Sequence, residues 1–127
     1  MVSKTTAVGG FVLCLLMVFA WASPTPSHTV TIQGYVLDSA CAFTKSLEKP
    51  ISEGCAVACA KAGSPLVILT ADGIIYLPVS DATPAISQND RLLPFAGKKV
   101  VASGKVYERK GAHALVIEKI DAAAEGK

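Results

Sequence analysis

The order of strand and helix patterns in the sequence predicts a mostly-β fold, namely a five-stranded OB-fold-like small barrel. Five segments have the pattern of β-strands, and one short helical pattern lies between the first and the second of them. A helical turn precedes the fourth strand, and this order is that of the partly open Greek-key barrel called the OB-fold. The same five strands are also compatible with another small barrel or an α+β sandwich. A chain of 127 residues has room for one such domain, which we place at residues 29–120.

The first strand is predicted at residues 29–36, where polar and apolar side chains alternate as in a half-buried strand. Gly34 stands in the apolar row of this strand, which indicates a bulge, a bend or a close approach of another backbone. Residues 38–52 show no periodicity, so we expect a long loop that holds Cys41. Ser52 is suited to begin a helix and Gly63 to end it, which predicts one short helix between them.

The remaining strands are each bounded by turn residues, and they are predicted at residues 66–70, 74–77, 98–107 and 113–120. Asp72-Gly73 is the signal of a two-residue hairpin between the first two of these strands. A helical turn is expected at residues 89–93, closed off by Pro94 and Gly97. Residues 121–127 form a short polar tail.

Residues 1–22 have the pattern of a secretory signal peptide. Lys4 precedes an apolar run that ends in Ala20-Trp21-Ala22, which is an A-x-A cleavage site. The run is short for a bilayer span, which needs about 20 apolar residues, and an uncleaved anchor is the alternative. We expect cleavage after Ala22 and a flexible linker at residues 23–28. The mature protein is then exported, either periplasmic or secreted, and is not associated with a membrane.

Several motifs together resemble one group of proteins. They are Gly34-Tyr35-Val36-Leu37-Asp38, the segment from Cys55 to Gly63, the strand at 65–70, Asp72-Gly73, the segment from Leu92 to Val100, and Ser103-Gly104-Lys105-Val106-Tyr107. In this combination the chain is similar to small secreted bacterial OB-fold proteins of uncharacterised function, from Thr29 to Ile120. The resemblance implies the OB fold and an exported location, and it brings no catalytic residues.

The mature chain keeps three cysteines, Cys41, Cys55 and Cys59. Cys55 and Cys59 lie four residues apart in the predicted helix, so they share one face with Cβ atoms about 5–6 Å apart. A disulfide needs Cβ atoms about 3.5–4.5 Å apart, so a bond between these two would strain the helix. Cys41 on its long loop is therefore the better disulfide partner for either of them.

Three hypotheses for the cysteines follow from this spacing. In the first, Cys41 forms a structural disulfide with one helical cysteine, and the third is buried as a small hydrophobic residue. In the second, all three are thiolate ligands of copper or zinc, with His113 or His28 as a candidate fourth ligand. In the third, they form a disulfide and thiol set with a redox role.

Composition and motifs argue against most other classes of function. Aromatic residues make up 6% of the chain and its net charge is +2, so a nucleic-acid partner is not expected, although Tyr35 and Tyr107 could form a small outward-facing platform. There is no Gly-x-Ser-x-Gly motif and no glycine-rich phosphate loop. The sequence thus predicts a non-enzymatic binding or scaffold module for an unknown small ligand or protein. A metal-binding or thiol-redox protein is the alternative.

Overall fold

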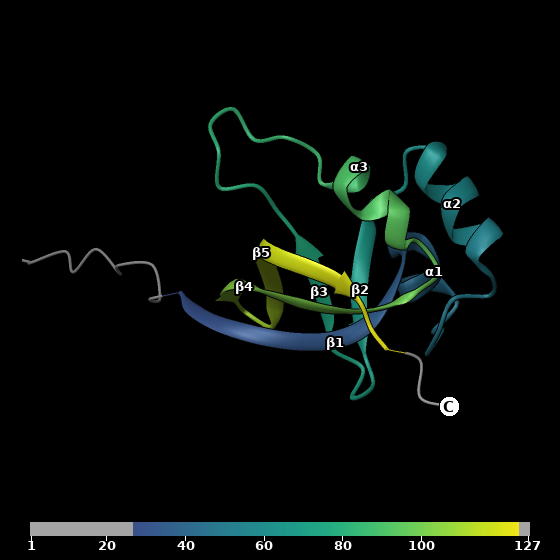
Figure 1. Ribbon diagram of the computed structural model, residues 1–127, viewed down its shortest axis with the longest axis horizontal. Helices are drawn as coiled ribbons and strands as arrows, with labels where there is room; N and C mark the ends of the chain where they lie inside the picture. Colours follow the sequence, from purple (N-terminus) through teal and green to yellow (C-terminus); the bar gives the residue numbers. More distant parts are fainter. Residues whose placement is uncertain (1–26, 125–127) are drawn as a thin grey trace, which may run out of the picture.

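The computed structural model describes residues 27–124 (Figure 1). The predicted signal peptide, its cleavage site after Ala22 and most of the predicted linker lie outside these residues. The elements follow one another as β1 (His28–Asp38), α1 (Ser39–Thr44), α2 (Glu53–Lys61), β2 (Leu66–Thr70), β3 (Ile75–Pro78), α3 (Asn89–Leu92), the 3-10 helix η1 (Leu93–Phe95), β4 (Lys99–Arg109) and β5 (Ala112–Ala122). None of the helices within residues 27–124 is both long enough and apolar enough to span a bilayer.

The five strands close into a barrel in the order β1-β2-β3-β5-β4, and β4 pairs with β1 to complete it. β3 and β5 run parallel, whereas every other neighbouring pair is antiparallel. α3 and η1 stand directly before β4, where the sequence predicts a helical turn. The prediction of a mostly-β, five-stranded OB-fold-like barrel is confirmed.

Between β1 and β2 the structure has two helices, whereas the sequence predicts only one. α2 is the expected helix, since the Ser52 hydroxyl accepts a hydrogen bond from the Cys55 amide at 3.0 Å and caps its first turn. α1 lies inside the segment expected to be a loop. It follows β1 directly because the Asp38 carboxylate accepts a hydrogen bond from the Cys41 amide at 2.9 Å and caps the helix. A helix of six residues is too short to show a helical period, so the hydrophobic pattern does not reveal it.

The main hydrophobic core fills the barrel, and buried residues of α2 and α3 belong to it together with the inward-facing residues of the strands. Inward-facing side chains such as Val36 on β1 and Val100 on β4 are fully buried. The small side chains of Ala56 and Ala60 let α2 approach the barrel closely. The buried members of this core are Ile32, Val36, Ala56, Ala60, Leu66, Ile68, Leu92, Ala96, Val100, Ala102, Val106, Leu115 and Ile117.

A second, smaller core lies on the outer face of the sheet, between β1, β2 and α1. Its buried members are Leu37, Ala42, Val67 and Leu69. Val36 and Leu37 point to opposite faces of β1, yet both are buried, because one faces the barrel interior and the other faces α1. Asp38 is the next residue, and it lies where the chain passes from β1 into α1.

Arg91 on α3 contacts the edge of β5. Its guanidinium donates hydrogen bonds to the carbonyl oxygens of Ile117 at 2.6 Å and Glu118 at 3.2 Å. The pairing of β5 with β3 ends at Leu115, so these carbonyls belong to the part of β5 that β3 does not cover. The side chain thus fastens α3 to the barrel.

Gly34 lies at the position where β1 changes partner. It pairs with Thr70 of β2 on one side and with Val100 of β4 on the other. A Cβ atom at Gly34 would collide with the backbone carbonyl of Leu69. Of the bulge, the bend and the close backbone approach that the sequence allows at this glycine, the structure shows the close approach, at the point where β1 pairs with both β2 and β4.

We expect Gly34→Ala to lower the free energy of unfolding by about 2 kcal/mol or more, because the new methyl group must push β2 away from β1. Urea denaturation followed by circular dichroism measures this change. Gly54→Ala is the matched control, because outside the backbone of its own helix and its chain neighbours a Cβ there would meet only the Ser52 hydroxyl oxygen, at 3.9 Å. Equal stabilities for the two variants would contradict the packing described for Gly34.

Candidate metal centre

The candidate site is built around Asp38, whose side chain is the one charged group buried within residues 27–124, with 2% of its surface exposed. Its carboxylate accepts hydrogen bonds from the Cys41 amide at 2.9 Å and from the Ser64 hydroxyl at 3.4 Å. Ser64 is itself held in place, because its carbonyl accepts a hydrogen bond from the Asn89 amide group at 2.8 Å. The end of β1, the start of α1 and the segment after α2 therefore meet at one carboxylate.

Two cysteines from different helices lie beside this carboxylate. A carboxylate oxygen of Asp38, the Sγ atom of Cys41 on α1 and the Sγ atom of Cys59 on α2 lie within 4.8 Å of one another. No other such cluster of three potential metal ligands from histidine, cysteine, aspartate and glutamate occurs in the described residues 27–124. The fold thus brings together two side chains from α1 and α2 with the last residue of β1.

Cys55 lies next to this group. It precedes Cys59 by one turn of α2, and its thiol contributes to the raised pKa of Cys59. A small cavity of about 10 Å³, which is close to the space of one water molecule, is lined by Cys41 and Cys55 together. All three cysteines are free thiols and are only partly exposed. The three cysteines singled out in the sequence are therefore close together.

The environment of Asp38 favours its charged form. Burial alone would raise the pKa of this carboxyl group. Hydrogen bonds to the carboxylate lower its pKa, and their combined effect outweighs that of burial. The donors are the amide and thiol of Cys41, the thiol of Cys59 and the hydroxyl of Ser64. The pKa of Asp38 consequently lies below its usual value, and the group is a carboxylate at neutral pH.

The same contacts favour the protonated form of the two thiols. The hydrogen bond to Asp38, then burial and the nearby negative charges, raise the pKa of Cys41 to about 11. For Cys59, burial is the largest cause and the charge of Asp38 adds to it, so that its pKa is also raised. At neutral pH both thiols hold their protons and are weak nucleophiles. A bound cation would reverse this balance, because a thiol that coordinates a metal ion loses its proton.

The two histidines considered as a fourth ligand are not part of this cluster. His28 is the first residue of β1 and Asp38 is the last, which separates them by roughly 30 Å along the strand. His113 lies on β5, where its Nδ1 atom is 3.2 Å from Glu108 Oε1 and its ring centroid is 5.5 Å from that of Tyr76. Strand register holds both histidines at other parts of the barrel.

Asp38 is the member of the site that the sequence analysis does not single out. A signal for it exists in the spacing Asp38-x-x-Cys41. An N-cap aspartate accepts a hydrogen bond from the amide of the third helical residue, and here that residue is Cys41. The cap thereby places the Cys41 thiol beside the carboxylate.

No protein-family model matches the chain, and neither a curated protein nor a solved structure matches it. The function has to be inferred from the chemistry of Asp38 and the three cysteines, and from the shape of the surface around them.

We expect Asp38→Asn to make Cys41 more reactive, because removing the carboxylate lets the thiol pKa fall from about 11 towards its ordinary value. At pH 8 the rate of alkylation by iodoacetamide should rise about tenfold, after allowing for the lower nucleophilicity of a less basic thiolate. Mass spectrometry of each cysteine over time measures the rate. Asp90→Asn on α3 is the control and should leave it unchanged. An unaltered rate in Asp38→Asn would show that the carboxylate does not govern this thiol.

Proposed function

We propose that this protein is a small, exported, non-enzymatic binding module whose Asp38, Cys41 and Cys59 bind a thiophilic metal ion. The observation that carries the proposal is the convergence of one buried carboxylate and two thiols from separate elements within 4.8 Å. The carboxylate can coordinate a metal ion directly, and the thiols can do so once they have lost their protons. The resemblance to small secreted bacterial OB-fold proteins belongs to the same proposal and supports the exported location.

Zinc suits this donor set better than copper. Zinc(II) accepts cysteine sulfur and aspartate oxygen in the same tetrahedral site. Copper(I) selects soft sulfur ligands and gains little from a carboxylate. Cys55 is the candidate for a third sulfur, because it lies one turn before Cys59 on α2 and lines the same small cavity as Cys41. Together with Asp38 this makes four donors, which is the number that a closed zinc site uses.

The position of the site indicates a structural effect of the ion. Cys41 belongs to α1, Cys55 and Cys59 belong to α2, and Asp38 ends β1. A metal ion held by these residues would connect both helices to the barrel. Because a ligand that binds only the folded state stabilises that state, metal binding would raise the free energy of unfolding.

A disulfide between Cys41 and Cys59 is the second candidate, and their proximity favours this pair. The two sulfurs lie within 4.8 Å of each other, and a bond would need them to approach to about 2.05 Å. The reaction removes one proton and one electron from each thiol. In thiol–disulfide exchange a small-molecule disulfide accepts both electrons, and its two halves leave as thiols. The raised pKa values of both thiols slow this exchange, whereas an oxidising compartment outside the cytoplasm favours its product.

We expect the reduced protein to bind one zinc ion. Zinc at a free concentration of 100 times the Kd should raise the free energy of unfolding by about 2.7 kcal/mol. Calorimetric titration and urea denaturation with and without zinc measure both effects. Cys59→Ser should weaken binding about tenfold or more, whereas His113→Asn, which lies outside the cluster, should leave the Kd unchanged.

Three outcomes separate the candidates. Binding of copper(I) with no binding of zinc would replace the metal identity proposed here. A protein that binds neither metal after full reduction would contradict the metal site itself. A preparation that contains one Cys41–Cys59 disulfide, found by peptide mapping without reductant, and still binds no metal after reduction would assign the cluster to the disulfide.

The exported location is tested separately. When the full chain is expressed in a bacterial host, we expect the mature protein in the periplasm or medium, with Ser23 as its first residue. Intact-mass measurement and N-terminal sequencing check this. Ala22→Leu removes the small residue that signal peptidase requires and should cause the uncleaved form to accumulate. Retention of the full-length native chain in the membrane fraction would instead indicate an anchor.

A further inference from the structure

The outer surface of the barrel next to α1 carries a second feature, a groove across four strands. The register places Leu69 of β2, Tyr35 of β1 and Lys99 of β4 side by side in one row, and Ile75 of β3 continues that row beyond Leu69. The side chains in this row are therefore apolar on β3 and β2, aromatic on β1 and cationic on β4.

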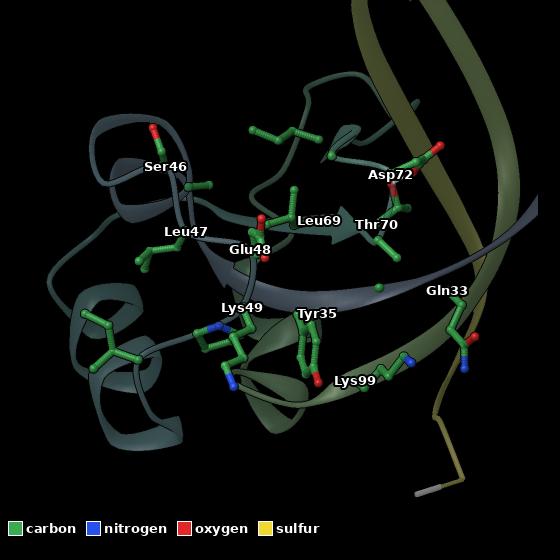
Figure 2. Close-up of a pocket in the computed structure, with 17 residues that line it drawn as sticks. Gln33, Tyr35, Ser46, Leu47, Glu48, Lys49, Leu69, Thr70, Asp72 and Lys99 are labelled. Atoms are coloured by element: carbon green, nitrogen blue, oxygen red, sulfur yellow. Dashed lines mark hydrogen bonds between the residues drawn. The ribbon is translucent and has the colours of Figure 1, made fainter. Parts of the chain in front are cut away.

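Residues 46–51, which connect α1 to α2, form the wall of this groove. Together with the strands they border a groove that is open to solvent and has a volume of about 1010 Å³, which is at the upper end of the range for small-molecule sites. Leu47 adds an apolar side chain to the wall and Lys49 adds a second ammonium group. Figure 2 shows Lys49 and Lys99 on either side of Tyr35.

The charges of the groove are unevenly distributed. Neither Lys49 nor Lys99 is in an ion pair with a described residue, so both ammonium groups are available to a ligand. Two carboxylates also line the groove, Glu48 and Asp72, and Figure 2 shows them on the other side of the β1 ribbon from Tyr35. Asp72 is already engaged, since it accepts a hydrogen bond from the Thr70 hydroxyl. The end of the groove around Tyr35 is therefore the part suited to negative charge.

We infer that this groove binds an amphipathic organic anion, with its acidic group between Lys49 and Lys99 and its apolar body on the partly exposed side chains of Tyr35, Leu47 and Ile75. The two ammonium groups supply the charge that such a head group needs. The aromatic and aliphatic side chains supply the surface that its body buries. A long polyanion fits less well, because Glu48 and Asp72 interrupt the positive surface.

Anilinonaphthalene sulfonate, an aromatic anion that fluoresces in apolar surroundings, is a suitable first probe. It should bind the purified protein and be displaced by dodecanoate. Dodecanol, which has the same chain without the charge, and inorganic phosphate, which has charge without an apolar body, should both displace it poorly. The titrations are made with a chelator present, so that failure of the metal proposal leaves the result unaffected.

The side chains of Lys49 and Lys99 are exposed, so their substitution tests the groove without threatening the fold. Lys49→Gln and Lys99→Gln should each weaken dodecanoate binding about threefold, and the double variant about tenfold. Glu48→Gln should strengthen binding, because it removes a like charge. Lys119→Gln is the matched control, since Lys119 pairs with Asp121 on β5 and does not line the groove.

Salt gives an independent check, since the affinity of dodecanoate should fall as ionic strength rises. Displacement by dodecanol as effective as that by dodecanoate would overturn the inference, because the charge would then play no part. Equal affinities in the double lysine variant and the Lys119→Gln control would overturn it as well. Stronger displacement by a single-stranded oligonucleotide than by dodecanoate would replace the small anion with a polyanion.

Discussion

The buried carboxylate of Asp38 is the constraint on which the arrangement beside the barrel depends. A charge removed from water is costly unless hydrogen bonds compensate for it. The compensating donors come from α1, from α2 and from the segment after α2, and each is fixed in place by this requirement. Asp38 also ends β1 between the two hydrophobic cores. The connection between α1 and α2 is therefore held at both ends, and its residues 46–51 are held over the outer face of the sheet.

The barrel could be predicted from the sequence because its signals are local. Alternation marks the strands, Asp72-Gly73 marks a hairpin, and Gly34 in the apolar row of β1 marks a bulge, a bend or a close backbone approach. α1 could not be predicted from periodicity, since it is short and depends on a cap and on burial of Ala42 against the outer face of the sheet. Tertiary packing, rather than helical propensity, determines such a helix.

The candidate site was predictable only in part, for the same reason. Spacing alone puts Cys55 and Cys59 on one helix face, but the approach of Cys41 requires α1 to fold back beside α2. The exclusion of His28 and His113 depends on strand register, which no local pattern specifies. The groove could not be predicted from the sequence either, because Lys49 and Lys99 are far apart along the chain. Lys99 lies beside Tyr35 through the pairing of β1 with β4, and Lys49 reaches the groove through the path of residues 46–51.

The contact of Arg91 with β5 has a consequence for the behaviour of the protein at high concentration. A strand that lacks a neighbour exposes carbonyl and amide groups that another chain can use to extend the sheet. β5 has such a stretch beyond Leu115, and the guanidinium of Arg91 occupies two of its carbonyls. A bulky positive charge at this place hinders a second strand from docking. The helical turn before β4 thus protects the barrel against edge-to-edge aggregation.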